Sequence, residues 1–574
     1  MKAYSAPLTK IACALSALAS LFSTAIAQDL SVDTSSREQS RVFYNTVFPA
    51  SQNAPMGWTG NTANGVAGNT SEGFKNSVFL RINFYRAFAG VPAGVTNNPA
   101  WSAMDQSAAL MMSANNKVDH HPAPSWKFYS AGGATAAGKS NLSLSTCGSD
   151  AIASYMEDPG NHNGPVGHRR WILYPQTRQM GTGDVPASGA NYAANALWTF
   201  DLDNAYAPRP AVRDEFVAWP PKGFVPYQLI YPRWSFSYPA ANFALAQVSI
   251  TRNGTGIPVN IVSRVEGYGE NTVTFVPSNL NPNAWAGPER PAGDTTYQVT
   301  VSNVLINGAP RQFTYNVIAF DPAVAGGDSP NAAINGPATP APGVETLYNV
   351  APQTLATGYQ WKYSSKAAYT TMIGAETAAG VIPKVQGGYS FRDKKIKSSG
   401  AYSYHLVHPR FTEGSFVLSD SVLCSGNTVL NFFSRLTYAT SFERATVEVS
   451  TDGGSQWQSV WMKKGTNNAG QKSFTKQSVS LAAFSGREVK VRFRYALVQG
   501  SAYTTVASGV GWYVDNISFA NAQKLTDTVV SGVSPTPTFS LVPAAGRTYV
   551  LQSRPLVLGR FFADWSVAKT ITTP

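Results

Sequence analysis

The spacing of apolar residues in this 574-residue chain changes from a helical period to a strand period near Pro208. Before that point, apolar residues over 78–89 recur at steps of three and four, as on one face of an amphipathic helix. After it, runs of β-forming residues such as 246–251 and 297–301 are bounded by Pro and Gly. A chain of this length is expected to hold about three or four domains. We therefore expect one helix-containing domain followed by several all-β domains.

The first 27 residues have the pattern of a cleavable export signal. Two lysines supply positive charge, an apolar run covers 11–22, and Ala25-Ile26-Ala27 forms a cleavage site before Gln28. The apolar run is too short to cross a bilayer as a helix, and no second long apolar run follows it. We expect a secreted or periplasmic protein that does not span the membrane.

Charge and cysteine content argue against two classes of protein. The formal net charge of +12 is spread along the chain instead of forming a basic stripe with stacking aromatics, so nucleic acid is not an expected partner. An affinity for acidic polymers or an anionic cell surface fits this charge better. Outside the export segment only Cys147 and Cys424 remain, so the chain has no disulfide framework.

Four of the six histidines lie within 79–173, namely His120, His121, His162 and His168. Imidazole is the side chain best suited to bind a transition metal or to move a proton near neutral pH. A helix expected over 100–117 ends just before Asp119-His120-His121-Pro122, because a residue that precedes proline is disfavoured in the α region. His120 is therefore predicted on a loop that leaves a rigid helix, which is a suitable place for a site.

The order of motifs over 74–205 resembles the CAP superfamily, which comprises cysteine-rich secretory proteins, antigen 5 and pathogenesis-related 1 proteins. The resemblance rests on a helix with Asn-x-x-Arg at 83–86, a second helix that ends in a histidine, Gly-His-Arg-x-x-Ile-Leu at 167–173 and Gly-x-Gly at 181–183. The chain is most similar to the bacterial secreted branch. The resemblance implies an α-β-α sandwich with a central cleft that holds two histidines and, in many members, two acids. That cleft can bind a divalent metal in the family, and other members bind lipids or sterols elsewhere.

Carried over by position, the two cleft histidines correspond to His120 and His168. Ser140 stands where the family has its first glutamate. The second acid falls at the end of the third helix, where Glu157 is the first choice and Asp158 the alternative. His121 and His162 have no counterpart in the family pattern.

A catalytic zinc ion uses three protein ligands and keeps one open position, which His120, His168 and Glu157 could supply together. We therefore consider Zn²⁺ or another divalent metal as a cofactor of the cleft, with Ser140→Glu expected to tighten its binding. The alternative is that the histidines cap helices and hydrogen-bond backbone carbonyls. The chain contains neither His-Glu-x-x-His nor Gly-x-Ser-x-Gly, so no reaction can be assigned.

The β-rich part resembles modular surface domains. Several short alternating strands over 208–322 are typical of an immunoglobulin-like sandwich, without a cysteine pair. The runs at 450–457 and 511–519 are similar to those of MAM-type or carbohydrate-binding jelly rolls, in which Asp515 could by analogy ligate calcium. The 450–457 run also fits the Asp-box pattern of sialidases, although Asp-Gly-Gly alone suits a hairpin.

The predicted fold class is a multidomain chain with an α-β-α sandwich CAP domain followed by all-β sandwich domains. The predicted segments are a signal peptide (1–27), a polar lead-in (28–73), the CAP domain (74–207), an immunoglobulin-like sandwich (208–322), a linker of Ala, Gly, Pro and Asn (323–343), a jelly roll (344–524) and a small C-terminal β unit or completing strands of its neighbour (525–574). We expect a 28–207 fragment to fold alone and proteases to cut first within 323–343.

The leading function is that of an exported bacterial protein that binds a ligand, a cell-envelope component or a glycan. One alternative is a metal-dependent hydrolase or peptidase that uses His120, His168 and an acid. A second is a glycan-binding adhesin in which the jelly roll is the functional domain.

Overall fold

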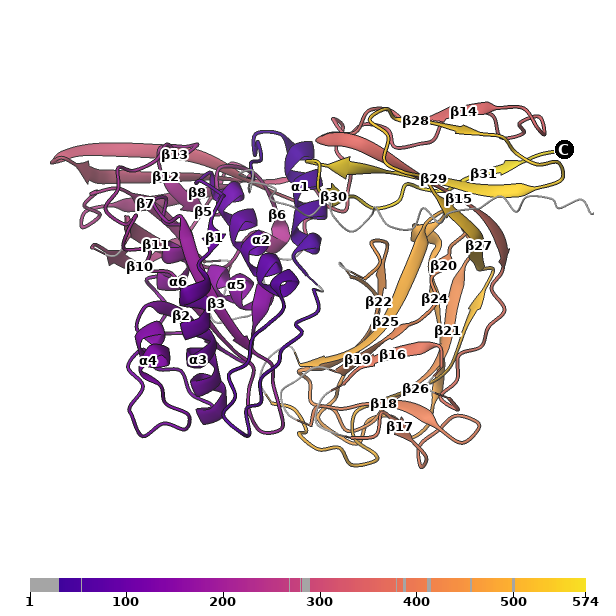
Figure 1. The fold of residues 1–574 in the computed structure, drawn as a ribbon, viewed down its shortest axis with the longest axis horizontal. Helices are drawn as coiled ribbons and strands as arrows, with labels where there is room; N and C mark the ends of the chain where they lie inside the picture. The colour runs from indigo at the N-terminus through magenta and orange to yellow at the C-terminus, as the bar shows by residue number, and fades with distance from the viewer. Residues whose placement is uncertain are drawn as a thin grey trace, which may run out of the picture.

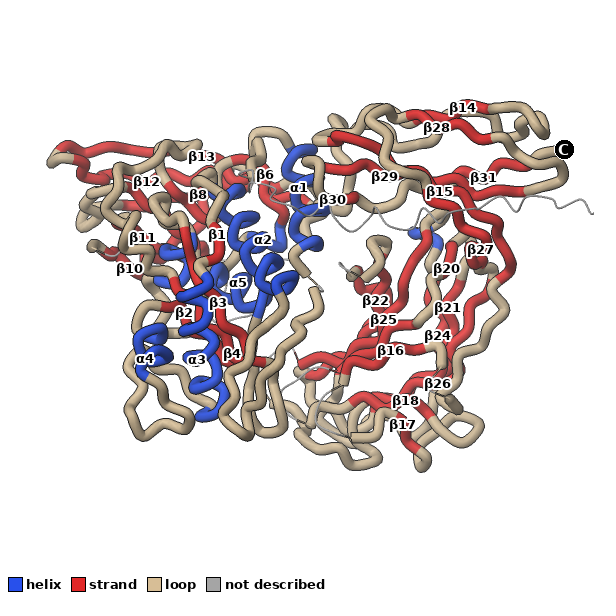
Figure 2. Tube along the Cα trace, in the orientation of Figure 1, coloured by secondary structure: helices blue, strands red, loops and turns tan. Residues whose placement is uncertain are grey.

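A computed structural model describes residues 30–52, 54–267, 269–278, 280, 290–377, 379–385, 389–409, 414–454, 457–497 and 501–574. The export segment, Gln28 and two residues of the 450–457 hairpin lie outside this set. The α-helices lie in one half of the molecule and the other half is built of strands (Figures 1 and 2), which confirms the predicted fold class. Within the described residues, no helix combines the length and apolarity needed to cross a membrane.

The N-terminal domain, residues 30–207, is an α-β-α sandwich around a four-stranded sheet of order β1-β3-β4-β2. Alternate residues of β4 face opposite layers, with Trp198 in the core beneath α3 and Leu197 in the core shared with α2 and α5. The elements are α1 (Arg37–Ala50), α2 (Glu72–Ala89), β1 (Thr96–Asn97), α3 (Pro99–Asn115), α4 (Ala131–Ala137), β2 (Ser140–Leu144), α5 (Gly148–Glu157), α6 (Gly167–Ile172), β3 (Gln179–Val185) and β4 (Ala194–Trp198).

The Gly-x-Gly motif of β3 allows α3 to lie directly against the sheet. A Cβ atom at Gly183 would lie 2.1 Å from the carbonyl carbon of Asp105, and one at Gly181 would lie 2.7 Å from Cβ of Trp101. Side chains do not tolerate such distances, so only glycine permits this close approach of strand and helix. The contact brings Asp105 of α3 against the sheet, where it becomes part of a buried polar network.

The second domain, residues 208–322, is a sandwich of two sheets with orders β10-β11-β7-β5 and β6-β13-β12-β8-β9. Asn307 and Gly308, both at positive φ, form the tight turn that joins the two longest strands of this domain. The elements are β5 (Val217–Trp219), β6 (Gly223–Pro226), the 3₁₀ helix η1 (Tyr227–Leu229), β7 (Trp234–Tyr238), β8 (Gln247–Arg252), β9 (Thr255–Ile257), β10 (Val259–Val265), β11 (Asn271–Pro277), β12 (Thr295–Ile306) and β13 (Ala309–Phe320).

The first two domains share one hydrophobic core. Tyr85 of α2 packs edge-to-face against Trp219 of β5, with ring centroids 5.4 Å apart, and its hydroxyl lies 2.8 Å from that of Tyr231. All three side chains are buried, and they belong to a cluster that runs from α1 to β12. Cutting at 207 would expose an apolar face that the second domain covers, so we now expect a 28–207 fragment to be less stable than a fragment with both domains.

The large sandwich, residues 369–522, packs the sheet β17-β18-β26-β21-β24 against a sheet containing β16, β19, β25, β22 and β23. Its elements are β16 (Val381–Lys384), β17 (Arg392–Asp393), β18 (Ser403–Leu406), β19 (Gly414–Leu418), β20 (Val422–Leu423), β21 (Val429–Leu436), β22 (Glu443–Ser450), β23 (Gln458–Lys464), β24 (Thr475–Ser480), the 3₁₀ helix η2 (Ala482–Phe484), β25 (Glu488–Leu497) and β26 (Trp512–Ala520).

The C-terminal unit combines two segments that are distant in the sequence, 344–368 and 523–574. Its long strand β15 pairs on one side with β27 and on the other with β29, and β27 continues through β20 into the sheet of the large sandwich. The large sandwich is thus inserted between two halves of this unit, an arrangement that strand patterns alone do not reveal. Its elements are β14 (Thr346–Asn349), β15 (Ala356–Ala368), β27 (Gln523–Val530), β28 (Thr538–Leu541), β29 (Thr548–Val557), β30 (Phe561–Phe562) and β31 (Lys569–Thr572).

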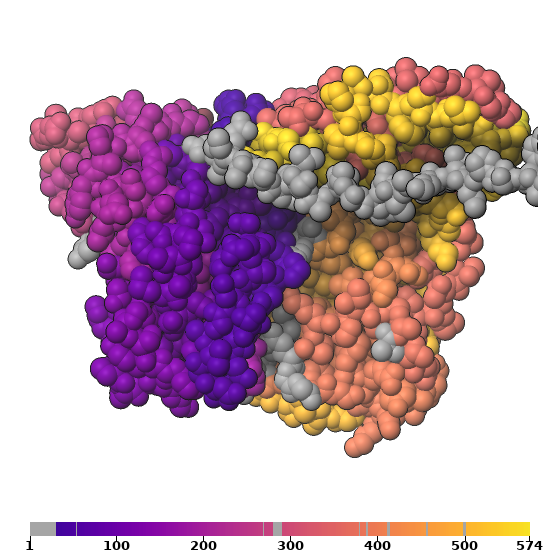
Figure 3. Space-filling view, in the orientation of Figure 1, coloured from indigo at the N-terminus to yellow at the C-terminus, as the bar shows by residue number. Residues whose placement is uncertain are grey.

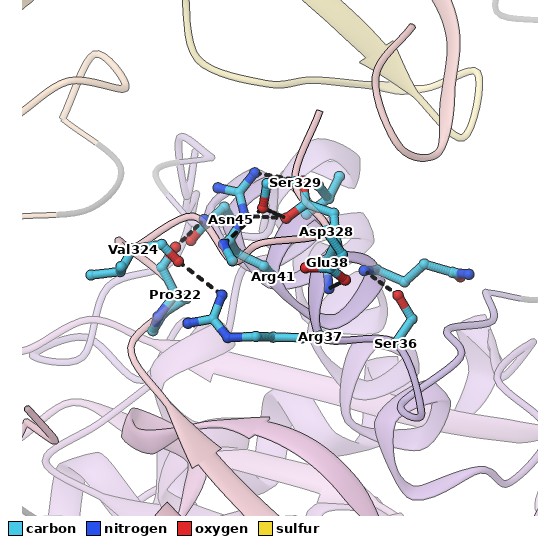
Figure 4. Close-up of polar contacts among 12 residues, drawn as sticks. Ser36, Arg37, Glu38, Arg41, Asn45, Pro322, Val324, Asp328 and Ser329 are labelled. Carbon is cyan, nitrogen blue, oxygen red and sulfur yellow. Dashed lines mark hydrogen bonds and ion pairs between the residues drawn. The ribbon is translucent and has the colours of Figure 1, made fainter. Parts of the chain in front are cut away.

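The beginning of the predicted linker lies against α1, a helix inside the predicted polar lead-in (Figure 4). Arg37 donates to the carbonyl of Val324 at 3.0 Å, and Asn45 donates to that of Pro322 at 2.8 Å. The buried carboxylate of Glu38 accepts a hydrogen bond from the hydroxyl of Ser329. Residues 322–329 therefore form a strap fixed to α1, so we no longer expect proteases to cut there first.

The shared core predicts which fragment unfolds as one unit. A fragment covering 30–330 retains the strap and both domains, so it should show a single cooperative urea transition by circular dichroism. A fragment covering 30–207 should bind a hydrophobic dye and unfold at lower urea, because it exposes the ring of Tyr85. Equal stability and equal dye binding for the two fragments would contradict the shared core.

Candidate functional site

Two of the predicted site residues, Asp158 and His168, form a hydrogen-bonded pair. Asp158 ends α5 in the left-handed region, at φ 54°, which turns its carboxylate toward α6. One carboxylate oxygen accepts from the ring Nδ1 of His168 at 2.8 Å, and the other accepts from the backbone N–H of His168 at 3.1 Å. The side chain of Asp158 is fully buried, whereas that of His168 is 27% exposed. Asp158 therefore fixes an imidazole that a ligand can still reach.

Neighbouring polar groups hold the same ring in place. Tyr155 stacks on the ring of His168 with centroids 5.2 Å apart, and its hydroxyl donates to Oδ1 of Asn195 at 2.8 Å. The side chain of Asn141 donates to the carbonyl of His168 at 3.1 Å. With Nδ1 bound to a carboxylate, the remaining nitrogen Nε2 is the atom of His168 suited to contact a ligand.

The second domain supports this site through two arginines. Arg169 is buried and donates to the carbonyls of Met156 at 2.6 Å and Arg233 at 2.8 Å. Arg233 donates to the carbonyl of Asp158 at 2.6 Å. The turn that carries Asp158 is thus fixed by the neighbouring domain. Glu157, the first choice for the second acid, contributes its carbonyl to Arg169 at 3.2 Å, and it is the alternative, Asp158, that contacts His168.

Ser140 binds a buried carboxylate that the sequence did not single out. Its hydroxyl donates to Oδ1 of Asp105 at 2.7 Å, and the backbone N–H of Trp198 donates to Oδ2 at 3.0 Å. Burial raises the pKa of Asp105 well above its ordinary value, against the opposing effect of these hydrogen bonds. A glutamate at position 140 would place a second carboxylate beside this buried acid, so we now expect Ser140→Glu to destabilise the fold.

Asp184 is the second buried acid of this network. Its carboxylate accepts from the backbone N–H of Gly148 at 2.6 Å, the hydroxyl of Thr182 at 2.9 Å and the amide of Asn195 at 2.8 Å. Burial raises its pKa although all three hydrogen bonds lower it. Because Asn195 also binds Tyr155, the network extends from the centre of the sheet to the ring beneath His168.

His120 lies on the loop after α3, as predicted, and its side chain is held by the end of α4. Its Nδ1 lies 2.8 Å from the carbonyl of Ala137, the last residue of that helix. This contact is the helix-capping role that the sequence left open for the cleft histidines. The residue itself is exposed to solvent.

The donor set does not fit a three-ligand zinc site. Across the described residues, no three His, Cys, Asp or Glu side chains lie together in a way that could hold a metal ion. Both carboxylate oxygens of Asp158 accept hydrogen bonds from His168, and the contacts of His168 and His120 each use Nδ1. We derive no catalytic step through a metal.

Asp515, the residue considered for calcium, anchors a turn. One of its carboxylate oxygens accepts from the backbone N–H groups of Ser398 at 2.9 Å and Ser399 at 3.2 Å, and the other accepts from that of Asn516 at 2.8 Å. Burial raises its pKa in opposition to these hydrogen bonds. A calcium ion at Asp515 stays a prediction.

The pair of His168 and Asp158 makes stability depend on pH. Burial alone would lower the pKa of His168, but the ring hydrogen bond to Asp158 and the charge of that carboxylate outweigh it, so the pKa is raised. Because the pKa of His168 is raised in the folded protein, the stabilisation from its ion pair with Asp158 is complete below about pH 6.5. This stabilisation is lost as pH rises through the folded-state pKa of His168.

We therefore expect Asp158→Asn to lower the free energy of unfolding by about 1–3 kcal/mol at pH 6, and by less at pH 9. Urea unfolding at the two pH values measures this difference. Asp150→Asn, at an exposed position of α5, is the control and should change little at either pH. A loss for Asp158→Asn that is equal at pH 6 and pH 9 would reject the ion pair.

Comparison with known proteins agrees with part of the sequence resemblance. A family model described as CAP, the cysteine-rich secretory protein family, matches residues 79–202. No curated protein matches the chain.

Solved structures give weak likenesses. The C-terminal family 22 carbohydrate-binding module of Clostridium thermocellum Xyn10B is 13% identical, with 28% of this chain and 96% of that chain covered at a TM-score of 0.18. The secreted serine protease VesC from Vibrio cholerae is 10% identical, with 61% of this chain and 56% of that chain covered at a TM-score of 0.14. Likenesses at these scores carry no argument about function. The family match, with the α-β-α sandwich around it, confirms the resemblance and identifies residues 79–202 as a CAP domain.

Proposed function

We propose that this protein is an exported binding protein of the cell envelope and that His168 contributes to its ligand site. The observation that carries the proposal is the fixed but reachable imidazole of His168, held by Asp158 and Tyr155. A side chain that is ordered before binding loses little conformational entropy when a ligand arrives. One oriented imidazole suits recognition of a hydrogen-bonding group.

The charge of the chain favours an anionic or acceptor-rich ligand. The formal net charge is +12, and the raised pKa of His168 increases the share of imidazolium at a given pH. Imidazolium donates hydrogen bonds from both nitrogens and attracts anions. Acidic polymers of the envelope have this chemistry, and the export pattern of 1–27 would bring the chain to them.

A metal-dependent hydrolase receives less support. Such a site needs three donors and an open position. Among the described residues no three His, Cys, Asp or Glu side chains lie together in a way that could hold a metal, and both carboxylate oxygens of Asp158 accept hydrogen bonds from His168. The buried carboxylates of Asp105 and Asp184 accept hydrogen bonds from Ser140 and Asn195 of the sheet.

Substituting His168 tests the proposed site. We expect His168→Gln to weaken co-sedimentation with isolated cell envelopes by about tenfold, because glutamine cannot carry the positive charge. His162→Gln is the matched control, since His162 is exposed in the same segment and should bind like the wild type. Equal binding by the two variants, with unchanged thermal unfolding, would remove His168 from the site.

Zinc titration separates the binding and hydrolase proposals. We expect weak Zn²⁺ binding by calorimetry at pH 7.5, with similar small effects of His120→Ala and His121→Ala, because no three donor side chains lie together among the described residues. Tight binding of one ion per chain that is lost on either His120→Ala or His168→Ala would instead establish a joint metal site.

Glycan binding by the β-rich part is a second candidate function. A cavity of about 650 Å³ lies between α1, the second domain, the large sandwich and the C-terminal unit, and two tryptophans are among its lining residues. Both tryptophans are partly exposed, and such aromatic rings beside polar side chains suit ligands with both apolar and hydroxyl-bearing faces. Neither His120 nor His168 is among the described residues that line this cavity.

A further inference from the structure

The cavity of about 650 Å³ lies where α1, the second domain, the large sandwich and the C-terminal unit meet. Its lining includes Asn45 and Thr46 of α1, the hairpin residues Asp452 and Trp457 of the large sandwich, and Trp565 of the C-terminal unit. A second cavity of about 310 Å³ adjoins it and shares Asp452 and Asp564. Figure 3 shows the N-terminal surface, in indigo and purple, beside the orange surface of the large sandwich. The size is that of a small-molecule site.

The two tryptophans are held by cations. The guanidinium of Arg492 lies over Trp457 at 4.3 Å from the ring centroid, and the indole N–H of Trp457 donates to the carbonyl of Gly454 at 2.8 Å. Arg554 and Lys362 lie over Trp565 at 4.4 and 4.6 Å. Because these rings are already ordered, Trp457 can serve as a stacking surface and Trp565 as an apolar wall.

The charges that line the larger cavity are balanced. Three arginines and three aspartates are among its lining residues. Arg290 pairs with Asp321 at 2.5 Å, and Arg41 pairs with Glu38 at 2.6 Å. The hydroxyl of Thr451 donates to Asp564 at 2.9 Å. A lining without excess charge favours a neutral polar ligand over an anion.

Two glutamine oxygens at these cavities have unused hydrogen-bonding capacity. Gln552 lines the smaller cavity, is 1% exposed and donates through Nε2 to the carbonyl of Ser566 at 3.0 Å. Its Oε1, and that of Gln228 in the larger cavity, are buried without a hydrogen-bond partner among the described residues. Neither oxygen is open to solvent, so a ligand hydroxyl can reach one only when the amide turns toward the cavity. A buried acceptor without a donor costs free energy, which favours such a turn at Gln228, because that residue is partly exposed.

We propose that the two cavities form one site for a short neutral oligosaccharide, stacked on Trp457, with a hydroxyl group donating to the amide oxygen of Gln228 when this amide turns toward the cavity. A sugar ring offers an apolar face to an indole and hydroxyl groups to amide and carboxylate oxygens, which matches this lining. The inference rests on the second candidate function, glycan binding, and gives it a site and a ligand class.

The test is calorimetry on the full chain with three neutral trisaccharides, maltotriose, cellotriose and triacetylchitotriose, and with anionic trigalacturonate. We expect at least one neutral sugar to bind and Trp457→Ala to weaken it by about tenfold or more. Trp126→Ala is the matched control, because Trp126 also lies beneath a cation, Lys117 at 5.2 Å, but in the N-terminal domain. It should leave the affinity unchanged.

Gln228→Leu keeps the proposal testable if Trp457→Ala fails to fold. Since Oε1 of Gln228 is buried without a partner among the described residues, its removal should not lower the thermal unfolding temperature, while sugar binding weakens severalfold. Binding that persists in both variants would exclude the cavity while glycan binding stands. A preference for trigalacturonate would overturn the ligand class. Failure of the wild type to bind any of the neutral sugars would reject glycan binding, and this site with it.

Discussion

The buried guanidinium of Arg169 is the interaction on which the arrangement of the N-terminal half depends. It joins the end of α5 to the second domain through the carbonyls of Met156 and Arg233, and burial lowers its pKa to about 10. A buried charge is tolerated only when its donors are satisfied, so this arginine fixes the positions of the carbonyls around it. The turn with Asp158, and through it the ring of His168, therefore has its orientation only when both domains are folded together.

Much of the N-terminal fold could be predicted because its signals are local. Ser71 caps α2 with its hydroxyl, Pro122 follows the loop after α3, and the Gly-x-Gly strand contacts that helix closely. The loop position of His120 and the end of α5, the third helix expected from the sequence, could be predicted from local signals of the same kind. The choice between Glu157 and Asp158 did not, because it depends on the left-handed conformation of Asp158 at the helix end.

The unpredicted features all depend on contacts between distant segments. An apolar stripe on α2 indicates burial, but it does not show that Trp219 of the next domain is the partner. Asp105 looks like a surface residue in its helix, and its burial follows from the glycines at 181 and 183. Strand β15 pairs with strands more than 150 positions later, and alternation alone carries no information about such partners.

Helix α1 connects these features, although its sequence reads as a polar lead-in. One face contributes Phe43, Tyr44 and Val47 to the core shared with α2 and the second domain. Another face holds the strap through Arg37 and Glu38 (Figure 4). A third lines the cavity with polar groups. Since one rigid helix contacts the CAP domain, the second domain and the cavity, a ligand bound there would favour the present arrangement of the domains over any other, as any ligand favours the state that binds it.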